Sequence, residues 1–336
     1  MEWHLKPVTA FSQYEDDWNR LNATHHDQAI LHSSFVKALI EHFMDGSETL
    51  CVGTQNGRIK ALGFLQRRRL GQWQTVMPSQ APLGLFLFEN HRFCHADVKA
   101  LAKALPGLVL MIDFLQVDTD GLTLETDPHF ETQPYIETGR LAIPGDYEAY
   151  FASLSKNTRQ NSKRIGNRLE KEGKEVAISR LTDPEAIREA LWEYGDIESR
   201  SWKAEHGTAI SKTNAQGRFY ESLLCSRPSH DISPEAWLYR INNETAAVDL
   251  CVRRKNTLVI LKTTYTDDFK QYSPAMQLKF EMIKHYASSD DNLASIEFFG
   301  KAMDWHRKLT ENIREIRHIT LMSVFGRYVL KLKTMF

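Results

Sequence analysis

Three side chains in the C-terminal half can carry out acid–base chemistry and stand within or beside apolar, strand-like runs. Asp249 lies in AAVDLCV, Glu297 lies in SIEFF, and Tyr265 ends a third apolar run. Burying a carboxylate is costly unless it is paired, so each acid is either part of a site or half of an ion pair. A buried carboxylate can accept a proton, and a phenol can donate one. These three residues are the catalytic candidates, with packing as the alternative for Tyr265.

A Ser-Pro pair at Ser273 and Pro274 opens a predicted helix after a predicted strand. Serine is a favoured N-cap, and proline fits the first helical position because its missing N–H would be unpaired there anyway. The start of a helix presents unpaired amides and the positive end of the dipole, which can hold a phosphate or a carboxylate. We therefore expect Ser273, Ala275 and Met276 to contact an anionic cofactor group. The alternative is an ordinary surface helix.

The segment from Lys156 to Lys174 is polar and basic, with seven Lys or Arg against two Glu. Lys156, Arg159, Lys163 and Arg164 can hold phosphates or an anionic substrate, since the first three share one face of a helix at spacings of three and seven residues. The alternative is a solvated helix face that needs charge for solubility. Of these residues, Lys156 and Arg159 are the cofactor-binding candidates.

The elements that must position these residues alternate between helix and strand throughout the chain. Apolar spacing and turn signals, including an Asn56-Gly57 hairpin turn, indicate an α+β fold. The expected helices cover residues 33–44, 95–105, 156–174, 184–202, 212–225 and 273–287. The expected strands cover residues 3–11, 108–115, 176–181, 236–242, 245–253, 258–266 and 294–299, with a mixed end at 313–332. Two halves of similar size and order predict two domains, residues 1–145 and 146–336, and suggest a duplicated fold.

Composition excludes several classes of protein. The chain has 336 residues, 42% of them hydrophobic, and a formal net charge of −1. That charge argues against a dedicated DNA binder, and no apolar run approaches the roughly 20 residues of a membrane span. Four scattered cysteines and the absence of a signal sequence predict a cytoplasmic protein without disulfides or a metal site. No G-x-S-x-G, H-E-x-x-H or G-x-G-x-x-G motif supports a hydrolase, a zincin or a dinucleotide-binding enzyme.

Four segments resemble the GNAT acyltransferase superfamily, in the branch of FemAB-like and CelD-type acetyltransferases. They are SLSKNTRQNSKRIGNRLEKEG at 153–173, Trp202 after a charged helix, YTDDFKQYSPAMQL at 265–278, and SIEFFGKAMDWHRKL at 295–309. The resemblance implies two tandem GNAT-like units, each with a mixed, mostly antiparallel central sheet flanked by helices. It also implies an acyl-CoA co-substrate held between two splayed strands, and Tyr265 as the acid that protonates the departing thiolate.

The resemblance has departures. The acyl-CoA signature Arg/Gln-x-x-Gly-x-Gly/Ala is absent, because the predicted helix begins YSPAMQL. Glu297 stands where the branch more often has Asp, and Trp305-His306 replaces a Tyr-Lys pair. Trp202, His206 and Trp305 are the candidates for substrate binding, with a surface role as the alternative for His206.

The resemblance leads us to expect an enzyme that moves an acyl group, acetyl in the first instance, from acyl-CoA. The acceptor would be an amine or hydroxyl on a small molecule or on an envelope or polysaccharide precursor. One alternative is a FemAB-like transferase that uses aminoacyl-tRNA, which the basic helix favours and the lack of a long coiled-coil insertion disfavours. Another is a non-catalytic GNAT-like module that binds partners in polysaccharide assembly.

Overall fold

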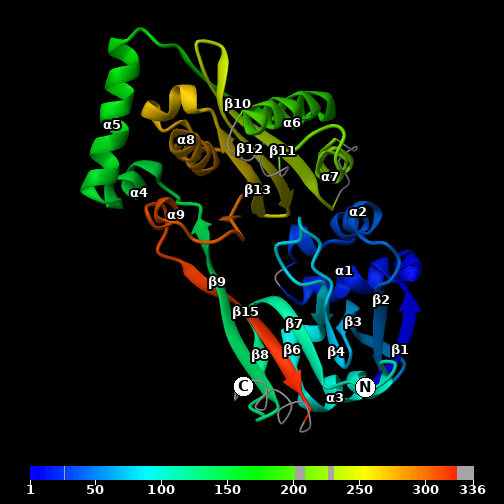
Figure 1. Cartoon of the computed structure of the whole chain (residues 1–336). Helices are drawn as coiled ribbons and strands as arrows, with labels where there is room; N and C mark the ends of the chain where they lie inside the picture. Colours follow the sequence, from blue (N-terminus) through cyan, green and yellow to red (C-terminus); the bar gives the residue numbers. More distant parts are fainter. Residues whose placement is uncertain (26, 201–208, 226–230, 324–336) are drawn as a thin grey trace, which may run out of the picture. The chain divides into compact units, whose positions relative to one another are not determined.

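The computed structural model describes residues 1–25, 27–200, 209–225 and 231–323 (Figure 1). The described residues divide into two compact units: unit 1 contains residues 1–137 and 314–323, and unit 2 contains residues 138–313. The sequence suggested a boundary near residue 145 and assigned the whole C-terminal segment to the second domain. In the structure, the last described strand instead packs with unit 1, because Ile316–Met322 pair with Met111–Asp118.

Unit 1 is a mostly antiparallel sheet with helices. Its strands follow the order β1-β2-β3-β4-β7-β15, and β5 also pairs with β3. The strands are β1 (Glu2–Pro7), β2 (Thr49–Gln55), β3 (Arg58–Arg69), β4 (Gln72–Thr75), β5 (Phe86–Phe88), β7 (Met111–Asp118) and β15 (Ile313–Met322). The helices are α1 (Glu15–Ala23), α2 (Ser33–Phe43) and α3 (His95–Ala104), and β6 (Arg92–Phe93) pairs with β8 (Thr123–Leu124).

Local sequence signals explain much of unit 1. Asn56 and Gly57 have φ values of 52° and 72°, as a type I′ turn requires, and they join β2 to β3 as predicted. Helix α2 buries Phe35 and Leu39 from the predicted apolar stripe. The predicted strand at residues 3–11 is shorter than expected, because the chain turns into a 3-10 helix at Val8.

Unit 2 has its own mixed sheet with helices on both faces. Its strands follow the order β9-β14-β13-β12-β11-β10 and are antiparallel except for the parallel pair β13–β14. The strands are β9 (Phe130–Ala142, of which residues 138–142 belong to unit 2), β10 (Val176–Leu181), β11 (Ser233–Ile241), β12 (Glu244–Arg254), β13 (Thr257–Tyr265) and β14 (Ser295–Glu297). The helices are α4 (Tyr147–Ser153), α5 (Lys156–Lys171), α6 (Pro184–Ser199), α7 (Ala215–Leu224), α8 (Pro274–Ser288) and α9 (Asp304–Arg307).

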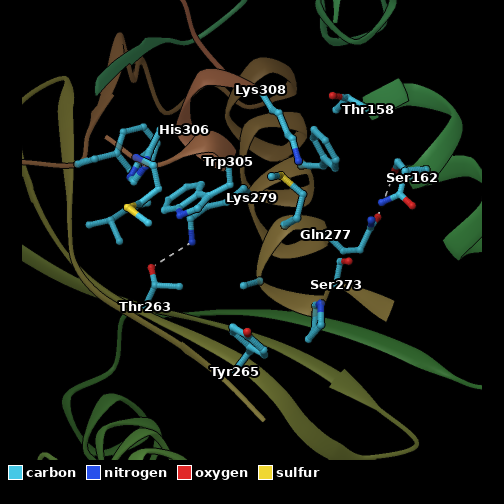
Figure 2. Close-up of a pocket in the computed structure, with 18 of the residues that line it drawn as sticks. Thr158, Ser162, Thr263, Tyr265, Ser273, Gln277, Lys279, Trp305, His306 and Lys308 are labelled. Atoms are coloured by element: carbon cyan, nitrogen blue, oxygen red, sulfur yellow. Dashed lines mark hydrogen bonds between the residues drawn. The ribbon is translucent and has the colours of Figure 1, made fainter. Parts of the chain in front are cut away.

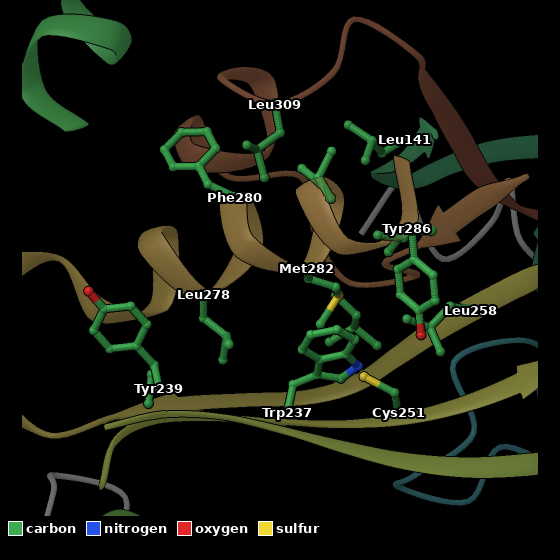
Figure 3. Close-up of a cluster of buried hydrophobic side chains, with 14 of the residues drawn as sticks. Leu141, Trp237, Tyr239, Cys251, Leu258, Leu278, Phe280, Met282, Tyr286 and Leu309 are labelled. Carbon is green, nitrogen blue, oxygen red and sulfur yellow. The ribbon is translucent and has the colours of Figure 1, made fainter. Parts of the chain in front are cut away.

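Helix α8 covers one face of the β11–β13 region, and α6 covers the other (Figure 1). Leu278, Met282 and Tyr286 recur every four residues along α8 and are buried against the sheet, where Trp237 and Cys251 meet them (Figure 3). Burying a side chain of this size stabilises the fold by about 1.5–3 kcal/mol. This packing fixes α8 on the sheet, so the side chains at its start have defined positions.

Local sequence explains both ends of helix α5 in unit 2. The Ser155 hydroxyl accepts a hydrogen bond from the Thr158 amide at the start of α5, and Gly173 follows that helix with φ of 61°. The α+β class predicted from the sequence is also confirmed. Within the described residues, none of the helices has the length and apolar character needed to cross a membrane. All four cysteines are free thiols.

Candidate active site

A large cavity opens in unit 2 where two neighbouring strands separate. Strands β13 and β14 pair only as far as Val259 and Glu297, and the residues that follow, Ile260 and Phe298, line a cavity of about 1250 Å³. β13 is also bulged against β12, with Leu261 as the extra residue, since Leu250 pairs with Lys262 and Cys251 with Ile260. The divergence therefore creates a space beside the sheet that α5, α8 and the segment around α9 enclose.

The cavity wall carries positive charge. Five cationic side chains line it, and no described lining residue is Asp or Glu; the cations are Arg164, Lys262, Lys270, Lys279 and Lys308. Side-chain amides and hydroxyls add hydrogen-bonding groups, including Asn157, Asn161 and Ser162 on α5. Of these cations, Lys279 is ion-paired with Asp249 and the Lys262 ammonium lies 5.8 Å from the Tyr220 ring centroid. Arg164, Lys270 and Lys308 are therefore the residues suited to charge-assisted hydrogen bonds with an anionic ligand.

Lys279 links the cavity to the interior of the sheet. Trp237, Asp249 and Thr263 are opposite one another on β11, β12 and β13, so their side chains share the face that α8 covers. Asp249 accepts hydrogen bonds from the Thr263 hydroxyl at 2.7 Å and from the Lys279 ammonium, with which it is ion-paired. Both of its oxygens thus have partners, and Asp249 is buried while Lys279 lines the cavity (Figure 2).

Trp305 and His306 lie beside Lys279 in the cavity (Figure 2). Their rings stack with centroids 3.5 Å apart, and the Lys279 ammonium lies 5.7 Å from the Trp305 ring centroid. The Met303 amide donates a hydrogen bond to Nδ1 of His306 at 2.9 Å, so Nε2 carries the hydrogen of the neutral ring. Burial and the nearby Lys279 charge lower the pKa of His306 to about 4. At neutral pH, His306 is therefore a hydrogen-bond donor and not a base.

The start of α8 differs from the predicted N-cap. Ser273 occupies the N-cap position, but its backbone is left-handed (φ 48°, ψ 51°) and its side chain makes no cap hydrogen bond. Its amide donates to the Lys270 carbonyl at 3.0 Å, and the Met276 amide donates to the Ser273 carbonyl at 3.0 Å. The predicted side-chain cap is therefore wrong, because the left-handed turn carries the serine away from capping geometry. Ser273, Ala275 and Met276 nevertheless all line the cavity.

Helix α5 faces the cavity with a different stripe from the one that we considered. Asn157, Gln160, Asn161 and Arg164, at spacings of three, four and seven residues, line the cavity. Lys156 and Arg159 are not among the lining residues, and the Arg159 Nε donates to the Leu154 carbonyl at 3.0 Å. The Ser162 hydroxyl donates to the Gln277 side-chain carbonyl at 3.2 Å, which ties α5 to α8 (Figure 2).

The remaining site residues predicted from the sequence do not all line the cavity. Tyr265 lines the cavity and is 48% exposed. Glu297 is buried, ion-paired with Arg140 opposite it on β9, and absent from the cavity lining. Trp202 and His206 lie outside the described residues. The structure therefore gathers Tyr265, Trp305 and the start of α8, but not the two carboxylates, around one space.

Sequence reasoning missed Lys279 and Lys270, whereas Arg164 was among the basic residues considered for an anionic ligand. Lys279 had a detectable signal: it interrupts the apolar face of α8 next to Leu278, while Asp249 interrupts an apolar strand. Two opposite charges at positions that pattern predicts to be buried favour an ion pair. Arg164 was considered but not selected over Lys156 and Arg159, because every position on the polar faces of α5 is compatible with solvent.

Comparison with known proteins identifies the family of this region. Residues 156–307 match the acetyltransferase (GNAT) domain family, so the chain carries a GNAT acetyltransferase domain. This match supports acyl transfer as the activity of the region. No curated protein matches the chain.

Solved structures resemble the chain over nearly its whole length. FemX shares 12% identity at a TM-score of 0.58, covering 98% of this chain and 99% of that one. A tandem GNAT protein from the clavulanic acid biosynthesis pathway shares 10% identity at 0.53, covering 95% and 98%. L-PGS from Bacillus licheniformis shares 13% identity at 0.50, covering 94% and 95%. At such identities the likeness shows the fold alone, and the predicted fold of two GNAT-like units is confirmed.

Proposed function

We propose that the chain is a cytoplasmic acyltransferase that binds acyl-CoA, with acetyl-CoA as the first candidate, in the cavity of unit 2. The acyl group would pass to an amine or hydroxyl of a small molecule or of an envelope or polysaccharide precursor. The observation that carries this proposal is the cavity between the diverging strands β13 and β14, with five cationic side chains and no carboxylate among its described lining residues. Coenzyme A bears a diphosphate and a further phosphate, which suit that wall.

The proposed placement follows from the chemistry of the wall. Arg164 and Lys270 would hold phosphates, together with the Ala275 amide at the start of α8, whereas the amides of Ser273 and Met276 already donate to backbone carbonyls. The thioester would lie towards Lys279 and Trp305, where Ile260 and Phe298 supply apolar surface. Catalysis would come mainly from positioning the acceptor against the thioester.

The acid–base candidates differ in their position relative to the cavity and so in their proposed roles. We propose Tyr265 as the acid that protonates the departing thiolate, since its phenol borders the cavity. Asp249 is proposed as a positioning residue that holds Lys279, because both of its oxygens are engaged. A proton-accepting role for Glu297 would require Arg140 to withdraw from it. Lys156 and Arg159 would act on a large anionic substrate outside the cavity.

A second candidate function uses aminoacyl-tRNA as the donor. The observation that favours it is the basic face of α5 outside the cavity, where Lys156 and Lys163 are exposed. Lysines on such a face can bind a nucleic-acid backbone, with an affinity that falls steeply as salt increases. This alternative also uses acyl transfer, so the two candidates differ in the donor carrier.

Calorimetric titration separates these functions. Acetyl-CoA and tRNA are each titrated into the full chain and into two variants at adjacent positions of α5, Arg164→Ala in the cavity wall and Lys163→Ala outside it. We expect acetyl-CoA to bind the parent chain, and Arg164→Ala to weaken its binding about tenfold, the usual effect of losing one charged hydrogen bond. Lys163→Ala should leave it unchanged.

Other binding results would favour one of the alternative functions. Binding of tRNA that Lys163→Ala weakens, without binding of acetyl-CoA, would favour the aminoacyl-tRNA donor. A chain that binds neither carrier would contradict both donors and favour the partner-binding module. If acetyl-CoA binds, release of free thiol from it in the presence of a panel of amines and sugars would identify the acceptor class.

A further inference from the structure

We propose that unit 1 binds a divalent transition-metal ion, of the Zn²⁺ type, through His95, Asp127 and His129. The three residues offer one ligand atom each, and these atoms lie within 4.8 Å of one another. The Asp127 carboxylate stands between the two imidazoles, with 2.9 Å from Oδ2 to His95 Nδ1 and 2.8 Å from Oδ1 to His129 Nδ1. The proposal is independent of the acyl-donor cavity, whose lining residues all belong to unit 2.

The distances are close to those of a metal site. Zinc binds imidazole nitrogen and carboxylate oxygen at about 2.0–2.2 Å, which places two ligand atoms of a tetrahedral site about 3.3 Å apart. The observed separations, from 2.8 Å up to the 4.8 Å limit, bracket this value. A zinc ion can therefore take the place of the hydrogens between Asp127 and the two imidazoles, if the side chains move by about 1 Å. Three protein ligands leave the fourth position for water, as in open zinc sites.

The backbone holds these ligands in place before any ion binds. The His129 amide donates to Asp127 Oδ1 at 2.7 Å, and the His129 carbonyl accepts from the Met322 amide on β15 at 3.0 Å. His95 is the first residue of α3, and its amide donates to Glu125 Oε2 at 2.7 Å. The cluster thus joins the start of α3 to the segment after β8. Glu125 holds the backbone of His95 at the start of α3.

The ligand chemistry selects the class of ion. Two imidazoles and a carboxylate suit Zn²⁺, Co²⁺ or Ni²⁺, whereas Mg²⁺ and Ca²⁺ prefer oxygen ligands. Asp127 and the nearby Glu125 supply negative charge, and the His95 and His129 rings are stacked with centroids 4.7 Å apart. The side chains of His95, Asp127 and His129 are 19%, 21% and 30% exposed, so an ion can reach them from solvent. The sequence predicted no metal, and this proposal departs from that expectation.

The test is a calorimetric titration of ZnCl₂ into the chelator-treated full chain, with MgCl₂ as the comparison ion. We expect one Zn²⁺ per chain with micromolar or tighter affinity, weakened at least tenfold by His95→Ala and by Asp127→Asn. The control is His4→Ala, which removes an exposed histidine of the same unit and should leave the affinity unchanged. Zn²⁺ should also raise the thermal unfolding midpoint of the parent chain, and not that of His95→Ala.

Three outcomes would overturn the proposal: no saturable binding of Zn²⁺ below millimolar concentrations, equal affinity in the parent chain and both cluster variants, or equal loss in His4→Ala. In the first case, Asp127 serves only to hydrogen-bond the two histidines. If His95→Ala does not fold, His129→Gln replaces it, and retained Zn²⁺ affinity in that variant would count against the site.

Discussion

Lys279 on α8 is ion-paired with Asp249 on β12, although their exposed fractions are only 2% and 0%. The Thr263 hydroxyl completes the arrangement with a 2.7 Å hydrogen bond to Asp249. A buried pair of this kind contributes little compared with a well-packed apolar pair, yet breaking it leaves one uncompensated charge in the interior. The pair thus fixes where α8 lies and where the Lys279 ammonium meets the cavity.

Removing either partner of this ion pair should therefore destabilise the chain, and removing both should cost less than the two single losses added together. We expect Asp249→Asn and Lys279→Met each to lower the free energy of unfolding by about 3 kcal/mol, because each strands the other charge. The double variant Asp249→Asn with Lys279→Met should lose clearly less than the sum. Urea denaturation of the four proteins measures the coupling. Additive losses would show that the two side chains do not depend on each other.

His306 should make stability depend on pH. Burial and the Lys279 charge lower its pKa from 6.5 to about 4, so between these values the unfolded chain binds more protons than the folded one. The free energy of unfolding is therefore highest above pH 6.5 and falls as the pH drops towards 4. Between pH 7 and pH 5 it should decrease by about 2 kcal/mol because of His306.

Denaturant titrations at pH 7 and pH 5 check this dependence. His306→Gln should reduce the difference between the two pH values by about 2 kcal/mol. The control is His4→Gln, which changes an exposed histidine and should keep the parent's difference. An unchanged pH dependence in His306→Gln would mean that its ring titrates alike in the folded and unfolded chains.

The left-handed backbone of Ser273 predicts an unusual response to substitution. A non-glycine residue with φ of 48° pays a conformational cost that glycine avoids, and here no side-chain cap compensates for it. We expect Ser273→Gly to raise the free energy of unfolding by about 0.5–1 kcal/mol, and Ser273→Val to lower it by more than 1 kcal/mol. Thermal or urea unfolding distinguishes this from a capping serine, for which Ser273→Gly would bring no gain.

Sequence patterns predicted the positions of helices, strands and turns better than the contacts between residues that are distant in the chain. The Asn56-Gly57 turn, helix α5 and strand β10 lie where turn chemistry, capping and alternation placed them, because these signals act over a few residues. Asp249 was recognised as half of an ion pair or part of a site, but its partner Lys279 lies 30 residues further along the chain. The left-handed Ser273 and the cavity-facing stripe of α5 depend on packing, which local pattern does not determine.

The return of the last strand to unit 1 predicts which fragments fold. Strand β15 buries Ile316 and Ile319, and Arg314 binds both carboxylate oxygens of the buried Asp118 at 2.8 Å. Residues 1–145 alone lack this strand and leave Asp118 unpaired, which costs several kcal/mol. We expect that fragment to show no cooperative unfolding transition. Joining residues 314–336 to residue 137 through a Gly/Ser linker should restore the transition, and equal behaviour of the two fragments would contradict the division.

The central claim is that the cavity beside β13 receives an acyl donor, and a crystal structure of the full chain with saturating acetyl-CoA tests it most directly. The account predicts density between β13 and β14, with the thioester near Lys279 and Trp305 and the phosphates near Arg164 and Lys270. An empty cavity at saturating ligand, or acetyl-CoA bound elsewhere while the cavity stays empty, would contradict the account.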